Sequence, residues 1–120
     1  MNSYRDLEVW RESMELAVAA YRITRDFPRE EMFGLTGQMR RATSSVPFNI
    51  AEGYARRGGR QFLHFCYIAR GSLAESETQL ELARRLGYVE SAAFEALWER
   101  MQVVGRLLNG LIRKLEQEQR

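Results

Sequence analysis

The chain has 120 residues, of which 45% are hydrophobic and 28% charged, and its net charge is only +2. This composition is typical of a globular protein, so we predict a single domain over residues 1–120 and exclude a disordered chain. One cysteine and one histidine exclude an intrachain disulfide, a multi-cysteine zinc site and a two-histidine metal site. Because no apolar run could span a membrane and the N-terminus has no apolar signal-peptide core, we expect a cytoplasmic protein without a membrane partner.

A first helix is predicted from Ser3 to Phe27. Ser3 and Asp6 have the spacing of a capping box, in which the serine accepts a hydrogen bond from an amide of the first turn. Pro28 ends the helix, because the residue before a proline is disfavoured in the α conformation. Apolar residues recur at intervals of three and four, which indicates one helix face; they are Leu7, Trp10, Met14, Ala17 and Tyr21.

A second helix is predicted from near Glu30 to near Arg57. Its apolar positions are Met32, Leu35, Met39, Val46, Ile50 and Tyr54. Pro47 falls inside it, where a proline removes one backbone hydrogen bond and crowds the preceding turn. We predict one helix kinked at Pro47, with two shorter helices as the alternative. Asn49 is expected to bond backbone groups freed by the proline.

The third and fourth helices follow clear turn signals. The third starts near Arg60, after Gly58-Gly59, and Gly87 is a natural C-terminal cap. The fourth starts near residue 90 or 91 and carries an unbroken repeat of apolar residues at intervals of three and four up to Leu115; its tail, EQEQR, is expected to fray. Four helices joined by short loops predict an all-α fold, an antiparallel up-down-up-down four-helix bundle.

The apolar surface is larger than a lone bundle needs to bury. The apolar arc of the first helix is wide enough for two neighbours, and Trp98 and Ile112 widen the stripe of the fourth helix. This excess predicts a stable homo-oligomer.

Residues suited to catalysis are nearly absent. His64 and Cys66 are two positions apart, on roughly opposite sides of a helix, and Cys66 falls in the apolar stripe as a small core residue. The pairs of glutamates four residues apart lie off the apolar stripes, beside arginines, as on a solvated surface. No glycine-rich phosphate loop is present. We therefore predict no enzyme, no catalytic residue, no cofactor and no metal site.

Positive charge is concentrated in the middle of the chain, where residues 32–72 contain six arginines and one acid. The turn at residues 55–60, ARRGGR, precedes the third helix, where free backbone amides and the helix dipole favour an anion. Guanidinium groups add bidentate hydrogen bonds to phosphate. An ordinary solvated turn is the alternative. The candidate nucleic-acid-binding residues are Arg40, Arg41, Arg56, Arg57 and Arg60.

Two consecutive segments carry a family resemblance. Phe33–Ala42, FGLTGQMRRA, and Ser45–Gly53, SVPFNIAEG, are similar to the signature of bacterial four-helix-bundle proteins encoded in 23S ribosomal RNA intervening sequences. Phe33 departs from the signature, where an aromatic residue with a hydroxyl is common. Further similar segments extend over nearly the whole chain: Asp6–Trp10, Phe62–Phe65, Ala69–Glu75, Glu77–Leu80 and Arg85–Tyr88. Physically, Glu52 is expected to pair with an arginine across the bundle and Gly53 to permit close helix approach.

The resemblance implies an antiparallel four-helix bundle that assembles as a homopentameric ring or barrel, and it carries over no catalytic residue. Related accessory proteins of diversity-generating retroelements bind nucleic acid and a reverse transcriptase. Two functions therefore stay open. The first is a non-enzymatic oligomeric scaffold that binds RNA or DNA through its basic middle segment. The alternative is a protein-interaction module, a ring that docks a partner polypeptide such as a reverse transcriptase and has no nucleic-acid role.

Overall fold

The computed structural model describes residues 3–120 as a bundle of four helices, without a strand in that range. The helices are α1 (Glu8–Thr24), α2 (Leu35–Ala55), α3 (Gly59–Arg85) and α4 (Ser91–Glu118), and two short 3-10 helices are η1 (Tyr4–Asp6) and η2 (Arg29–Glu31). The prediction of an all-α four-helix bundle is confirmed. None of the described helices is long and apolar enough to cross a membrane.

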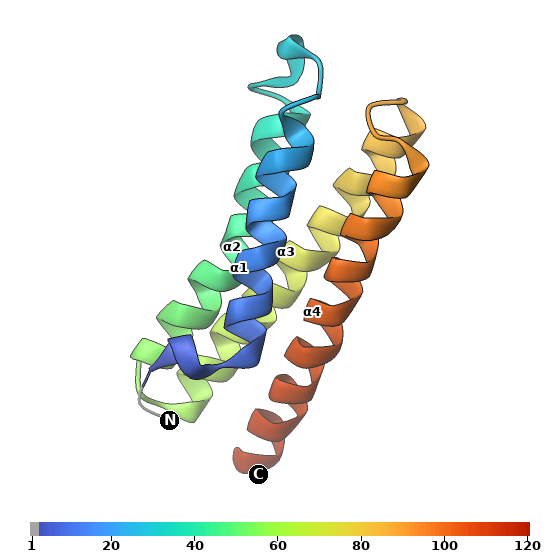
Figure 1. Ribbon diagram of the computed structural model, residues 1–120. Helices are drawn as coiled ribbons and strands as arrows, with labels where there is room; N and C mark the ends of the chain where they lie inside the picture. Colours follow the sequence, from blue (N-terminus) through green and yellow to red (C-terminus); the bar gives the residue numbers. More distant parts are fainter. Residues whose placement is uncertain (1–2) are drawn as a thin grey trace.

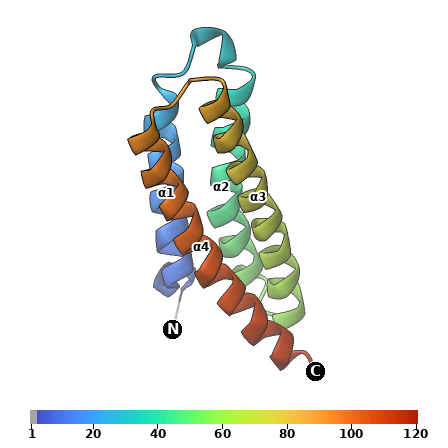
Figure 2. The same ribbon diagram turned by 90° about the vertical axis from the view of Figure 1, so that its right-hand side faces the viewer.

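The chain runs up α1, down α2, up α3 and down α4 in Figure 1. Both chain ends and the α2–α3 turn therefore lie at one end of the bundle, which we call the terminal end (residues 3–8, 54–62 and 111–120). The α1–α2 and α3–α4 connections lie at the other end, which we call the loop end (residues 25–34 and 86–90). Figure 2 shows the same arrangement from the side.

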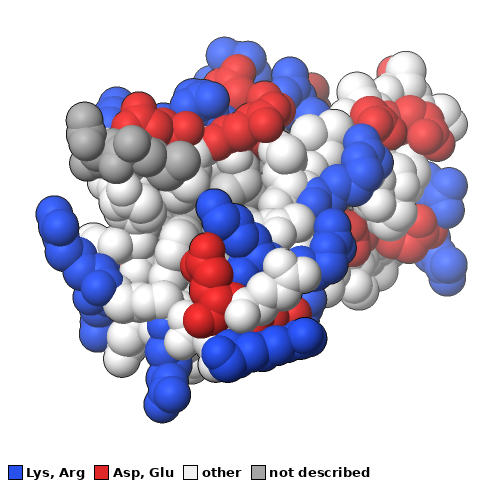
Figure 3. Space-filling model, turned by 90° about the horizontal axis from the view of Figure 1, so that it is seen from below, with Lys and Arg blue, Asp and Glu red and all other residues white. Residues whose placement is uncertain are grey.

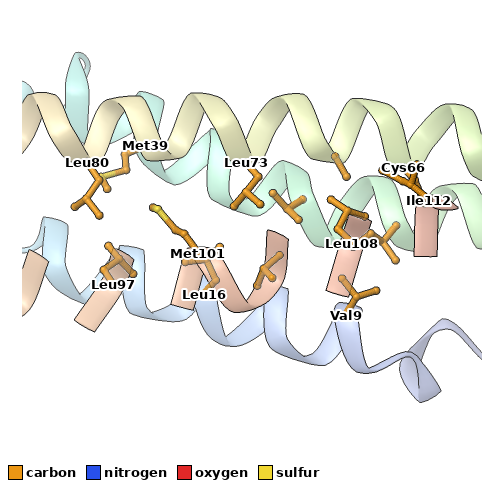
Figure 4. Close-up of a cluster of buried hydrophobic side chains, with 14 of the residues drawn as sticks. Val9, Leu16, Met39, Cys66, Leu73, Leu80, Leu97, Met101, Leu108 and Ile112 are labelled. Carbon is orange, nitrogen blue, oxygen red and sulfur yellow. The ribbon is translucent and has the colours of Figure 1, made fainter. Parts of the chain in front are cut away.

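The core lies between the four helices and is made of the apolar positions that recur along them. Leu16, Met39, Leu80 and Met101, one from each helix, are completely buried, and Figure 4 shows such side chains pointing toward one another between the helices. Cys66 is buried among them, as its place in the apolar stripe predicted. Burial raises the pKa of its thiol to about 12.

The first helix begins later than the sequence predicted. Ser3 does cap a helical turn, because its hydroxyl accepts a hydrogen bond from the Arg5 amide at 3.0 Å, but that turn is η1. Leu7 then takes an extended backbone conformation, so α1 starts only at Glu8. At the other end the helix gives way to turns after Thr24, three residues before the predicted end.

The second helix also begins late, because the residues before it form η2 instead of its first turn. Gly34 interrupts the helical backbone, and the Glu31 carboxylate accepts a hydrogen bond from the Leu35 amide at 3.1 Å. From Leu35 the helix continues through Pro47 as one element, so the alternative of two shorter helices is wrong. The kink at Pro47 stays a prediction.

The remaining boundaries follow the glycines. α3 starts at Gly59, and Gly87 ends it with a φ of +79°, a conformation that suits glycine. α4 continues to Glu118, so the EQEQR tail is mostly helical rather than frayed. Two contacts hold this tail: the Tyr67 hydroxyl donates a hydrogen bond to the Glu116 carboxylate, and the Gln119 side chain covers Gly59.

The α2–α3 contact is close at Gly53, as predicted. A Cβ atom at this position would lie 2.7 Å from the Phe65 Cβ and 3.3 Å from the Phe62 carbonyl oxygen. Further up, the Ser45 and Ser72 hydroxyls are hydrogen-bonded at 2.8 Å. Asn49 donates to the carbonyl of Ser45 at 2.8 Å. Pro47 has no N–H and so leaves the carbonyl four residues before it without its helical donor. Asn49 bonds a different carbonyl, that of Ser45, so the role we expected for Asn49 is wrong.

Candidate nucleic-acid interface

Three of the five candidate arginines come together in the α2–α3 turn at the terminal end. Arg56 follows the last residue of α2, Arg57 has a positive φ of 59°, and Arg60 lies in the first turn of α3. The left-handed backbone at Arg57 reverses the chain within a few residues. All three side chains are exposed.

The charge of Arg56 is partly compensated by its surroundings. Its guanidinium forms an ion pair with Glu52 at 2.7 Å and lies 5.0 Å from the centre of the Phe65 ring. Glu52 therefore pairs along its own helix, one turn away, and the expected pairing across the bundle is wrong. Within residues 3–120, Arg57 and Arg60 form no ion pair, so these two are better placed than Arg56 to hold a phosphate.

Arg40 and Arg41 lie far from this turn. Sixteen residues of helix separate Arg40 from Arg56, which is about 24 Å at 1.5 Å per residue. The Nε of Arg40 donates to the Thr24 hydroxyl at 2.9 Å, and its guanidinium lies 4.7 Å from the centre of the Tyr21 ring. Arg40 thus fastens α2 to α1. Arg41 is exposed, one residue further on the same helix.

A cavity of about 590 Å³ opens beside the arginine turn. Sequence reasoning missed it, because its wall combines residues from both ends of the chain with residues of the turn. Lys114, near the end of α4, faces it together with Arg57. The residues around it are Leu7, Tyr54, Arg57, Gly58, Gly59, Phe62, Leu111, Lys114, Leu115 and Glu118. Figure 3 views this end and shows arginine and lysine side chains around uncharged surface, with acidic side chains among them.

Other chemistry is sparse in the part of the chain that the structure describes. No group of three or more histidine, cysteine, aspartate or glutamate side chains could hold a metal ion there. Cys66 is buried, and His64 is exposed with its ring 5.3 Å from that of Phe65.

Exposed apolar side chains gather between α1 and α2. Val18, Tyr21 and Phe48 border a hollow of about 320 Å³, and Phe48 is 67% exposed. The flank of α4 that motivated the oligomer prediction is different. Ile112 is 1% exposed, and Trp98 is half-buried and stacked on Phe94. The exposed large apolar side chains lie instead on α1, α2, α3 and the segment before α2.

Comparison with known proteins identifies the family of this chain and a solved structure with a similar fold. The model of the family described as 23S rRNA-intervening sequence protein matches residues 5–110. Among solved structures, the chain is similar to a protein of unknown function from the S23 ribosomal protein family of Bacteroides thetaiotaomicron VPI-5482. The two are 25% identical, with a TM-score of 0.81, over 88% of this chain and 95% of that chain. No curated protein matches. The relation to retroelement accessory proteins stays a prediction.

Proposed function

We propose that this chain, which belongs to the 23S rRNA-intervening sequence protein family, is a non-enzymatic oligomeric scaffold that binds RNA or DNA at its terminal end. The observation that supports this proposal is the set of cations gathered there. Arg57 and Arg60 in the α2–α3 turn, and Arg113 and Lys114 at the end of α4, form no ion pair within residues 3–120. Their charge is therefore available to phosphate.

The local backbone supports the same ligand. Gly58 precedes α3 and no side chain forms a capping hydrogen bond there, so the positive end of the helix dipole lies beside Arg57 and Arg60, next to the Gln119 side chain that covers Gly59. Contacts of this kind are made to phosphate, so little sequence preference is expected. One such cluster binds weakly, but a closed oligomer repeats it in every subunit and raises the effective concentration.

The oligomer is part of the proposal. We expect the α1–α2 surface around Phe48 to be covered by a second copy, and the number five comes from the family resemblance alone. Sedimentation equilibrium at micromolar concentration should give a mass several times 14.0 kDa. Phe48→Glu should lower that mass while leaving the helical circular-dichroism spectrum unchanged. A mass of one chain for the wild type would refute the oligomer.

Binding is tested with a triple alanine variant of Arg56, Arg57 and Arg60. Its control removes three exposed arginines away from the terminal end: Arg29, Arg85 and Arg100. In gel-shift or filter assays with the same RNA and DNA at low and moderate salt, the first variant should bind more weakly and with a shallower salt slope than the control. Failure of the wild type to bind either polymer refutes the proposal. Equal loss in both variants refutes the assignment to this turn.

The alternative, a module that docks a partner polypeptide such as a reverse transcriptase, is supported by the exposed apolar hollow between α1 and α2. Salt separates the two functions. Binding through several phosphates weakens steeply as salt is added, whereas apolar docking does not and instead shows a negative heat-capacity change.

A further inference from the structure

We propose that the cavity at the terminal end holds one unpaired nucleotide, with the base against its apolar wall and the phosphate between Arg57 and Lys114. The inference rests on the proposed function and narrows it, because it makes single-stranded nucleic acid the preferred ligand. A free nucleotide offers the same base and phosphate as a nucleotide within a strand, and competition with a mononucleotide distinguishes these two ligands.

The wall of the cavity suits a base. Leu7, Leu111 and Leu115 supply aliphatic surface from the start of the chain and from α4, and Phe62 supplies an aromatic ring from α3. The Tyr54 and Phe62 rings stand almost at right angles, at 89°, with centres 5.8 Å apart. Bases of any sequence stack on aromatic side chains, which gives affinity without base-specific hydrogen bonds.

The charges around the opening suit a phosphate and also orient it. Arg57 lies in the α2–α3 turn and Lys114 on α4, so the two cations come from different elements. Glu118 is the acid among the residues around the cavity, and its carboxylate repels a phosphate. A nucleotide therefore has its phosphate directed toward Arg57 and Lys114 and away from the last turn of α4.

A double helix cannot use this cavity in the same way. Its bases are paired and stacked inside the duplex, so only its phosphates can reach Arg57 and Lys114. The contribution of the apolar wall is then lost. Base stacking on an aromatic residue corresponds to at least about fivefold in affinity, and we expect single strands to bind about tenfold more tightly than the duplex of the same sequence.

The experiment uses fluorescence anisotropy with the wild-type chain. The probes are a labelled single-stranded 12-mer, the duplex of the same sequence, and unlabelled mononucleotide as competitor. Two neighbouring residues of α4 form a matched pair: Lys114 lines the cavity and Arg113 does not. Lys114→Ala should weaken binding of the single strand several-fold more than Arg113→Ala. Glu118→Gln should strengthen it.

A direct readout locates the base. Light-induced crosslinking of a bromouridine-substituted 12-mer, followed by mass spectrometry, should attach the base to the peptide that contains Tyr54 or Phe62. Crosslinks confined to other parts of the chain would overturn the proposal. Circular-dichroism melting checks that each variant is folded.

The outcomes separate this inference from the function on which it rests. Equal affinity for single strand and duplex, with equal losses in Lys114→Ala and Arg113→Ala, overturns the cavity but keeps nucleic-acid binding. Binding of the mononucleotide that depends on Lys114, without binding of either polymer, supports the cavity with a free nucleotide and refutes the scaffold proposal. No binding of any probe refutes both.

Discussion

Replacing Gly53 or Gly71 by alanine should change stability in opposite directions, although both glycines lie inside long helices. Alanine is favoured over glycine in a helix interior by about 1 kcal/mol. At Gly71 nothing lies within 4 Å of the added Cβ, so we expect the full gain of about 1 kcal/mol. At Gly53 the added atom meets the Phe65 Cβ at 2.7 Å and the backbone of Phe62 at 3.3 Å.

These neighbours of Gly53 cannot move without separating α2 from α3. Overpacking of this kind costs about 1–3 kcal/mol. The Phe65 Cβ and the Phe62 carbonyl oxygen are fixed to the backbone, and the Phe62 ring crowds the added atom as well, at 3.1 Å, so we place the cost at the upper end of this range. We therefore expect Gly53→Ala to lower the free energy of unfolding by about 2 kcal/mol, which leaves the two variants about 3 kcal/mol apart.

Urea denaturation followed by circular dichroism measures this difference. The wild type and both variants must be compared at the same protein concentration, because assembly also contributes to the apparent stability. Thermal melting gives a second measure, at about 4 °C per kcal/mol for a domain of this size. If Gly53→Ala is as stable as Gly71→Ala, the close approach of α2 and α3 at this point is refuted.

Two further predictions concern titratable groups. Hydrogen bonds from the Leu35 amide and the Tyr88 hydroxyl lower the pKa of Glu31 below its ordinary value of 4.5, so this carboxylate stabilises the fold at neutral pH and the stabilisation is lost as the pH falls below 4.5. Glu31→Gln should flatten the acid limb of stability in urea melts at pH 7 and pH 3, and an unchanged slope would contradict the role of this carboxylate. The Cys66 thiol, fully buried and with a pKa of about 12, should react with Ellman's reagent only as the chain unfolds. Labelling of the native protein faster than unfolding would show that the core opens locally.

The helices could be predicted from the sequence because their apolar residues recur at a helical period. The unbroken repeat up to Leu115 placed α4, and the glycines around residues 58 and 87 placed the ends of α3. Helix starts were less predictable, because they depend on single hydrogen bonds. The Ser3 hydroxyl caps η1 rather than α1, and the Glu31 carboxylate, four residues before Leu35, caps α2.

The candidate site was predictable only in part, because some of its residues are far apart in the sequence and are brought together only by the fold. Arg56, Arg57 and Arg60 are neighbours in sequence and remain so in the fold. Arg40 has the same charge, but its guanidinium bonds Thr24 at the end of α1 instead of joining the turn. This contact follows from the packing of α1 on α2, which the sequence pattern does not specify. Lys114 lies 57 residues after Arg57, and only the return of α4 to the terminal end brings the two to one cavity.

The placement of this cavity has a consequence for its dynamics. Its wall uses the residue before α1, the end of α2, the start of α3 and the last turns of α4, so it is built from helix ends, which open more readily than helix centres. Amide hydrogens there should exchange with solvent faster than those around Met101. A ligand that joins Arg57 to Lys114 would bridge the α2–α3 turn and the C-terminal turns. The slowing of exchange on binding should then extend along α4 beyond the residues that the ligand contacts.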